Sequence, residues 1–159
     1  MVNISTPAIL IGVVGAGSCE TDTAEIAETV GIEIARNNAV LVCGGLGGVM
    51  AAAARGARKG GGLTIGLLPG ISHADANPDI LIPIPTAMEH ARNVLIVRAC
   101  HGLIAISGGY GTLSEIALAL KMKKPVIGIH SWSLDRHLEN VSSPVMAVRK
   151  IIESVKGRD

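Results

Sequence analysis

The chain has 159 residues, which is enough for one domain around a single hydrophobic core. Hydrophobic residues make up 48% of it, the net charge is +1, and there is one Trp, one Tyr and no Phe. These values argue against nucleic acid as a partner, because both basic clusters and stacking aromatic residues are scarce. The apolar runs are short and the first twelve residues lack signal-peptide features, so we expect a cytoplasmic protein with no membrane partner.

Short apolar, β-branched runs alternate with helix-like patterns along the chain. Continuous apolar runs are typical of strands buried on both faces, and they predict strands at residues 8–14, 39–43, 63–68, 80–85, 102–107 and 125–130. Apolar residues at helical spacing predict helices at about residues 22–37, 48–60, 87–100, 112–123 and 142–156. This alternation predicts an α/β fold in which helices flank both faces of one open parallel sheet, in a single domain over residues 1–159.

Two segments carry further expectations about surfaces. The predicted helix at 87–100 contains NVLIVRAC, which is apolar nearly all round and hard for one sheet to cover. We therefore expect this helix at a subunit interface of a homo-oligomer. The segment 69–79 is polar and turn-rich, and it could be a lid or a surface loop.

The sequence predicts no metal site. Cys19, Cys43 and Cys100 are widely spaced without a CxxC motif, so we expect buried thiols rather than a disulfide framework or a zinc site. His73 with nearby acids, and His130 with a later histidine, lack a complete set of ligand spacings.

Ligands of open parallel sheets bind beyond the carboxyl ends of the strands, and three such ends are rich in glycine here. In the first loop, GVVGAGSCETD, Gly15 and Gly17 begin a G-x-G-x-x-G pattern, but Glu20 occupies the third glycine position. The second predicted strand ends without the acid that would hold a ribose, so the loop is not a dinucleotide fingerprint. Gly15, Gly17 and Ser18 remain candidates for ligand contact because they follow a strand.

The second loop, CGGLGGVM, leads straight into a helix through Gly44, Gly45, Gly47 and Gly48. Bare amides at a helix N-terminus attract phosphate or another anion. No Gly-Lys-Ser/Thr follows, so this is not a nucleoside triphosphate loop. Close packing of helix against strand is the alternative reason for these glycines.

The third loop, SGGYGTLSE, repeats the same device with Gly108, Gly109 and Gly111. If the second and fifth strands approach each other, two anion-binding helix ends lie side by side. Tyr110 is the one side chain beside this loop that could contact a purine or pterin ring.

Structural explanations exist for the charged residues near these loops. Asp22 with Glu25, and Thr112 with Glu115, have the spacing of capping boxes, which predicts helix-capping roles for both acids. Similarly, a glutamate three residues before Arg92 could pair with it on a solvated face.

Taken together, Arg92, Arg98 and SGGYGTLSE resemble the pattern R-x5-R-x8-[P/S]-G-G-x-G-T-x-x-E of the LONELY GUY family, often mislabelled lysine decarboxylases. CGGLGGVM, which ends at Met50, is similar to that family's G-G-G-x-x-G-x-M motif. The resemblance implies a Rossmann-like fold, oligomers, and a nucleoside 5′-monophosphate phosphoribohydrolase of the cytokinin-activating type, which releases base and ribose 5-phosphate. It also implies that Arg92 and Glu115 form the catalytic pair. The phosphate-binding residues that it implies are Gly108, Gly109, Gly111 and Thr112.

The chain departs from that pattern at three positions. Ser107 replaces the proline, Asn93 replaces a lysine, and Ser114 replaces the first of two adjacent glutamates. The short chain and GGYGTLSEIALAL followed by KPVIGI look closer to the molybdenum cofactor carrier-like branch of this superfamily. That resemblance implies a homodimer or homotetramer that requires no cofactor and holds a molybdenum cofactor or a nucleotide.

Three functions remain open at this stage. The favoured one is a binding protein for a phosphate-bearing small molecule, a molybdopterin-type cofactor or a nucleotide, held by two glycine-rich loops with Arg92 as counter-ion. The alternative is the phosphoribohydrolase, in which Glu115 acts on the ribose through an oxocarbenium-like transition state. A structural or signalling module that senses a nucleotide is the third.

Overall fold

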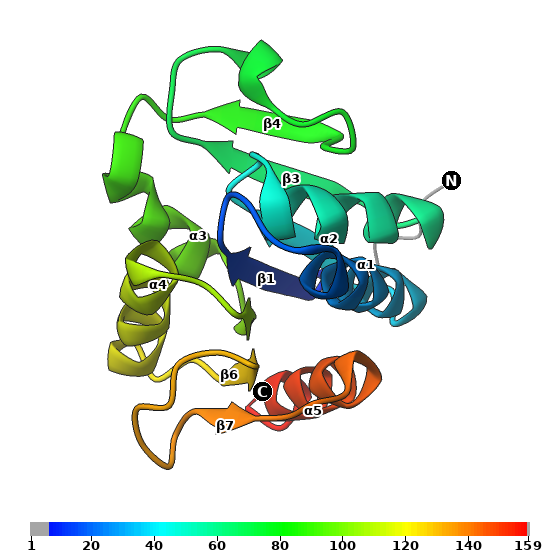
Figure 1. Ribbon diagram of the computed structural model, residues 1–159, viewed down its shortest axis with the longest axis vertical. Coiled ribbons are helices and arrows are strands. Elements are labelled where there is room, and N and C mark those ends of the chain that lie inside the picture. Colours follow the sequence, from blue (N-terminus) through cyan, green and yellow to red (C-terminus); the bar gives the residue numbers. More distant parts are fainter. Residues whose placement is uncertain (1–6, 159) are drawn as a thin grey trace.

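A seven-stranded parallel sheet runs through the middle of the protein, with helices on both faces (Figure 1). The computed structural model describes residues 7–158. Neighbouring strands follow the order β4-β3-β2-β1-β5-β6-β7. The strands are β1 (Leu10–Gly15), β2 (Val40–Cys43), β3 (Thr64–Leu68), β4 (Ile82–Pro85), β5 (Gly102–Ile106), β6 (Val126–Ile129) and β7 (Glu139–Asn140). The helices are α1 (Thr21–Arg36), α2 (Gly48–Lys59), α3 (Asn93–Ala99), α4 (Tyr110–Lys121) and α5 (Pro144–Lys156), with short 3₁₀ helices η1 (His73–Asp75) and η2 (Glu89–Arg92).

This architecture confirms the predicted single-domain α/β fold, with two differences. The helix expected at 87–100 starts as the 3₁₀ helix η2, which runs directly into α3, and the left-handed backbones of Ala87 (φ 54°) and Glu89 (φ 48°) exclude a regular helix before it. The two-residue strand β7 was not predicted, since Glu139 and Asn140 are polar and exposed and give no apolar run.

Alternate side chains of the strands feed two separate core layers. Ile11, Val13 and Ile104 pack in the layer covered by α1, α2 and α5. Val14 and Leu103 pack in the opposite layer with α3 and α4, on the other side of the sheet (Figure 1). Burial on both faces is why these strands appear in the sequence as unbroken apolar runs.

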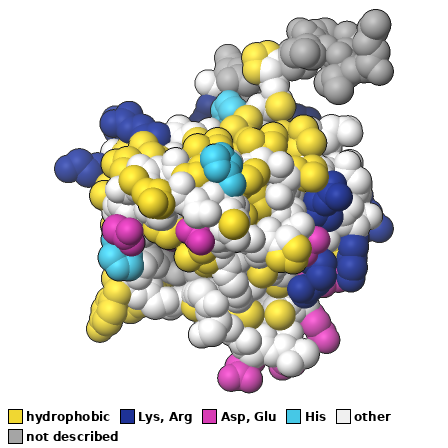
Figure 2. All heavy atoms as spheres, turned by 90° about the horizontal axis from the view of Figure 1, so that it is seen from above, with side chains coloured by type: hydrophobic (Ala, Val, Ile, Leu, Met, Phe, Trp, Pro, Cys, Tyr) yellow, Lys and Arg dark blue, Asp and Glu magenta, His cyan; other side chains and the backbone are white. Residues whose placement is uncertain are grey.

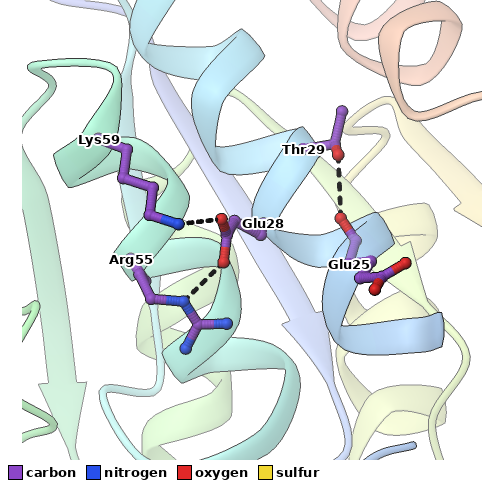
Figure 3. A network of polar contacts seen from close by, with 5 residues as sticks. All are labelled: Glu25, Glu28, Thr29, Arg55 and Lys59. Carbon is purple, nitrogen blue, oxygen red and sulfur yellow. Dashed lines mark hydrogen bonds and ion pairs between the residues drawn. The ribbon is translucent and has the colours of Figure 1, made fainter. Parts of the chain in front are cut away.

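Helices α1 and α2 touch through their backbones. A Cβ atom at Gly31 would lie 2.0 Å from the carbonyl oxygen of Ala53, and one at Gly56 would lie 1.9 Å from that of Glu28. Beside this contact the Glu28 carboxylate binds Lys59 at 2.5 Å and Arg55 at 2.6 Å (Figure 3). Hydrogen bonds from Lys59 and then Arg55 lower the pKa of Glu28.

The capping box expected at Asp22 and Glu25 is wrong. Helix α1 begins at Thr21 with Glu20 as N-cap, so Asp22 already lies inside the helix, where its side chain cannot cap the first turn. Glu25 instead accepts a hydrogen bond through its backbone oxygen from Thr29 Oγ1 at 2.9 Å (Figure 3).

The segment 69–79 supports the second glycine loop. Asn77 donates from its side-chain amide to the backbone oxygens of Gly45 at 3.2 Å and Leu46 at 2.8 Å. The Asn77 backbone N–H donates to the same Gly45 oxygen at 2.9 Å. This segment therefore fixes the loop after β2.

Within residues 7–158, no helix is long and apolar enough to cross a membrane.

Candidate ligand-binding site

A cavity of about 320 Å³ opens at the carboxyl ends of β1, β2 and β5. Strand β1 lies between the other two, and Gly15 at its end pairs with Ile106 at the end of β5. The chain leaves β1 toward β2 and returns to β5 on the other side, which is the switch point where open α/β sheets bind ligands. The lining residues are Val13, Val14, Gly15, Ala16, Gly17, Gly44, Met50, His90, Arg92, Asn93, Gly109, Gly111, Thr112 and Glu115.

Most of the residues expected at the site line this cavity. They are Gly15, Gly17, Gly44, Met50, Arg92, Gly109, Gly111, Thr112 and Glu115. His90 also lines the cavity but was not expected there, although it lies two positions before Arg92 on η2.

Other expected residues lie outside the cavity lining, and three of the glycines among them have packing roles. Gly45 (φ +76°), Gly48 (φ +59°) and Gly108 (φ +101°) adopt left-handed conformations. A Cβ atom would also collide at each, for example 2.3 Å from the Ala16 oxygen at Gly48. Close packing, the alternative considered from the sequence, thus accounts for part of the glycine content. The expected residues outside the lining are Ser18, Gly45, Gly47, Gly48, Gly108 and Tyr110.

Three glycines of the lining have a different character. An added Cβ atom at Gly17, Gly109 or Gly111 would meet no described atom within 4 Å. At these positions the missing side chain leaves open space at the cavity wall rather than room for a neighbour. Gly109 and Gly111 lie at the start of α4, where unpaired backbone N–H groups and the helix dipole favour an anion.

Arg92 is held in the cavity wall with part of its guanidinium unpaired. Its side chain is buried, with 8% of the residue exposed. Nη1 donates to Asn93 Oδ1 at 2.9 Å and Nη2 to the Gly44 oxygen at 3.4 Å. Nε is buried and has no hydrogen-bond partner among residues 7–158. Burial lowers the pKa of Arg92, and nearby Glu115 acts in the opposite direction.

The solvated ion pair expected between Arg92 and Glu89 is therefore wrong. Glu89 is exposed, whereas the arginine is buried and donates to Asn93 and Gly44. Their three-residue spacing would bring them together on a regular helix, but the left-handed backbone at Glu89 breaks that geometry.

Glu115 faces the same cavity and does not cap a helix. Helix α4 begins at Tyr110 with Gly109 as N-cap, so Thr112 and Glu115 both lie inside the helix. The predicted capping box is wrong because the glycines allow the helix to start earlier than the Thr-x-x-Glu spacing suggests. Only 6% of Glu115 is exposed, and burial raises its pKa to about 7 although Arg92 lowers it.

Two departures from the family pattern contact each other beside the cavity. Asn93 Nδ2 donates to Ser114 Oγ at 3.2 Å, and Ser114 Oγ donates to the Gly111 oxygen at 2.6 Å. Because Asn93 also accepts from Arg92, an uncharged chain of hydrogen bonds connects the arginine to the glycine loop. This neutral bridge occupies the positions at which the resemblance leads us to expect a lysine and a glutamate.

Residues 8–155 match the family model described as SLOG cluster4. The chain belongs to the SLOG cluster4 family. This SLOG cluster4 protein is 46% identical over 145 residues to an uncharacterised protein of Archaeoglobus fulgidus, a match that spans 91% of this chain and 95% of the relative.

Solved structures resemble this SLOG cluster4 protein over almost its whole length. One is the molybdenum cofactor binding protein of the phototrophic bacterium Rippkaea orientalis, 35% identical with a TM-score of 0.88, covering 96% of this chain and 99% of that one. Another is the molybdenum cofactor carrier protein of Chlamydomonas reinhardtii, 32% identical with a TM-score of 0.86, covering 94% and 99%. These findings confirm the resemblance to the LONELY GUY superfamily and its molybdenum cofactor carrier-like branch.

The titratable side chains of this SLOG cluster4 protein do not gather into a metal centre in the described part of the chain. No three His, Cys, Asp or Glu residues among 7–158 lie close enough to share an ion. The three cysteines are free; Cys43 and Cys100 are buried and Cys19 is half-buried. Burial raises the pKa of Cys43 to about 11 and of Cys100 to about 12, so both stay protonated thiols near neutral pH.

Proposed function

We propose that this protein binds a phosphate-bearing small molecule, a molybdopterin-type cofactor or a nucleotide, and releases it unchanged. The observation that carries the proposal is Arg92, which lines a cavity with open glycines and whose buried Nε has no partner among the described residues. A buried donor without an acceptor costs free energy, and a ligand oxygen would remove that cost. The similarity to a molybdenum cofactor binding protein and a carrier protein supports this assignment.

In this proposal the phosphate lies between Arg92 and the first turn of α4. The backbone amides at Gly109 and Gly111 supply short-range donors, and the helix dipole adds a favourable field. The open space at both glycines is what an approaching phosphate oxygen requires. Gly17, in the loop after β1, is open in the same way on another wall of the cavity.

The charges around the cavity are the reason why we favour binding over turnover. With a pKa of about 7, Glu115 is protonated in a large fraction of molecules at neutral pH. A neutral carboxyl group does not repel the phosphate and can donate a hydrogen bond to it. The Asn93–Ser114 bridge is uncharged as well, so it offers no further group to polarise water or a ribose.

One observation favours the phosphoribohydrolase as the second candidate. A carboxyl group with a pKa of about 7 suits proton transfer at neutral pH, and Glu115 shares the cavity with Arg92. In that case Glu115 would stabilise the developing oxocarbenium ion or orient water, while Arg92 orients the phosphate. Free base and ribose 5-phosphate would then accumulate.

We also propose that the protein works as a homodimer or homotetramer in the cytoplasm, with no cofactor required beyond the molecule it carries. Apolar side chains of β4 support the oligomer, because Ile82 is 42% and Ile84 41% exposed on a face of the sheet that α3 and α4 cover only in part. Nucleic acid and membranes are not expected as partners.

Calorimetric titration with AMP and with ribose 5-phosphate tests the binding proposal. Arg92→Met should weaken both ligands by about tenfold to a hundredfold, because a charged hydrogen bond contributes about 1.5–3 kcal/mol. Arg98→Met is the matched control, since Arg98 lies on α3, which follows η2 directly, and is exposed. Equal affinities for the wild type and the Arg92 variant would show that Arg92 does not bind the ligand.

A further inference from the structure

The fold brings the chain's only tyrosine and only tryptophan together at the third glycine loop. Tyr110 is the first residue of α4, and Trp132 lies in the connection after β6. Their ring centroids are 6.1 Å apart and the ring planes meet at 31°. The sequence gives only a faint signal of this pairing, namely that Trp132 follows the end of β6, the strand next to β5.

Hydrogen bonds fix the tryptophan to the glycine loop. Its Nε1 donates to the backbone oxygen of Gly109 at 3.2 Å, and Ser131 Oγ donates to the oxygen of Ser107 at 3.0 Å. Asn140 on β7 holds the far side of the same connection by donating to the Trp132 oxygen at 3.0 Å. The aromatic pair is thus positioned by the same loop that begins α4.

The tyrosine ring is left open beside the main cavity. Tyr110 is 84% exposed, which is unusual for a large aromatic side chain without a covering element. It borders a shallow groove of about 720 Å³ that runs along α3 and α4, and the groove also contains Ala91, Val94 and Leu118. The groove shares His90, Asn93 and Gly111 with the main cavity.

We propose that this groove binds a planar heteroaromatic ring, the pterin or purine part of the ligand, stacked on Tyr110. The inference rests on the proposed function, because the phosphate end of the same molecule lies in the main cavity. The shared residues make one continuous site with a polar end and an apolar end. Hydrogen-bonding groups of His90, Asn93 and Ser114 lie along the groove, where they can meet the polar edge of such a ring.

The position of the aromatic pair favours a small ligand over a second copy of the chain as the occupant of the groove. Stacking on an exposed aromatic ring needs only a planar group, and every purine or pterin presents one. The apolar part of the groove ends at the polar residues of the phosphate site, so its occupant must carry both kinds of surface. A phosphorylated pterin or a nucleotide has that composition.

The test compares GMP with ribose 5-phosphate, which carries the phosphate without the ring. Guanine has the same 2-amino-4-oxopyrimidine edge as a pterin. In calorimetric titrations Tyr110→Ala should weaken GMP binding about tenfold or more, and Tyr110→Phe should keep it. Ribose 5-phosphate should bind the wild type and both variants equally. Because Trp132 is the only tryptophan, its fluorescence should change on addition of GMP and stay constant with ribose 5-phosphate.

The contrary outcomes separate the two proposals. If ribose 5-phosphate binds but GMP binds no tighter, or if Tyr110→Ala leaves GMP affinity unchanged, the ring site is wrong and the phosphate site stands. If neither ligand binds the wild type, both proposals fail. If Tyr110→Ala changes the mass in sedimentation and Trp132 fluorescence depends on protein concentration alone, a second copy covers the groove and the inference is overturned.

Discussion

At the residue scale, Glu115 and Arg92 define the chemistry of the cavity. Each is almost fully buried, and each pKa is shifted by burial toward the neutral form. Burial of opposite charges in one cavity is costly unless they are paired or bound by a ligand. Arg92 donates to the Asn93 side chain and the Gly44 backbone oxygen, and its buried Nε has no partner among residues 7–158.

Glu115 predicts a pH dependence of stability. Its pKa rises from 4.5 to about 7 on folding, so between these values the folded protein holds a proton that the unfolded chain has lost. The free energy of unfolding should therefore fall with rising pH in this window, by up to about 3 kcal/mol, and level off above it. Glu115→Gln stays neutral and should lack this contribution.

Urea unfolding of both proteins from pH 5 to pH 8 measures the effect. The variant should gain stability relative to the wild type as the pH rises. The comparison cancels the titration of every other group. A difference that is constant over this range would mean that Glu115 does not carry a raised pKa.

Most positions at the site could be predicted from the sequence, but their roles could not. Glycines after apolar runs mark the carboxyl ends of strands, which is why Gly15, Gly44 and Gly109 were expected there. The Thr-x-x-Glu spacing is the same inside a helix as at its start, so it could not show that Glu115 faces a cavity. The sequence also could not reveal that Trp132 lies beside Tyr110, because this contact depends on β6 lying beside β5.

At the scale of elements, the glycines divide into those that permit packing and those that leave open space. Gly56 on α2 and Gly111 on α4 are both helical, so sequence pattern alone treats them alike. In the structure a Cβ atom at Gly56 would meet backbone at 1.9 Å, whereas one at Gly111 would meet no described atom within 4 Å.

The two glycines should therefore respond in opposite ways to alanine. Gly56→Ala should lower the free energy of unfolding by about 1–3 kcal/mol, through overpacking of α1 against α2. Gly111→Ala should raise it by about 0.5 kcal/mol, because alanine favours the helix. Gly111→Ala should also weaken AMP binding by about tenfold, if the phosphate contacts the Gly111 amide at the cavity wall as proposed, because the added methyl group would crowd that contact.

Urea unfolding and calorimetric titration of the two variants provide the readouts. If Gly111→Ala binds AMP as well as the wild type, this end of α4 does not receive the phosphate. Every strand except β7, and most helices, could be predicted because burial on one or two faces leaves an apolar pattern. The break before η2 depends on left-handed backbone at Ala87 and Glu89, for which the sequence has no glycine signal.

At the scale of the whole molecule, apolar side chains gather at the β4 end. Figure 2 looks down on this end and shows groups of hydrophobic side chains across the surface. The register places Pro83 and Pro85 opposite Gly66 and Leu68 of β3, while Ile82 and Ile84 alternate with them. Prolines lack an N–H group, so the free edge of β4 is poorly suited to adding another strand. Contact with a second copy should then use the exposed isoleucine face.

Sedimentation at micromolar concentration tests that contact. The wild type should sediment as a dimer or tetramer, and Ile84→Glu should shift it toward the monomer because a charge would be buried in the interface. Val145→Glu is a suitable control, since Val145 is 51% exposed on α5 at the opposite face of the sheet. A monomeric wild type, or equal effects of both variants, would contradict an interface at β4.

The central claim is that the cavity holds its phosphate-bearing ligand without cleaving it. The most direct measurement is equilibrium dialysis of the protein against AMP, followed by chromatography of both chambers. The account predicts excess AMP on the protein side, lost in Arg92→Met, and no free adenine or ribose 5-phosphate. Adenine that accumulates with time, and that disappears in Glu115→Gln, would show that the protein is a phosphoribohydrolase instead.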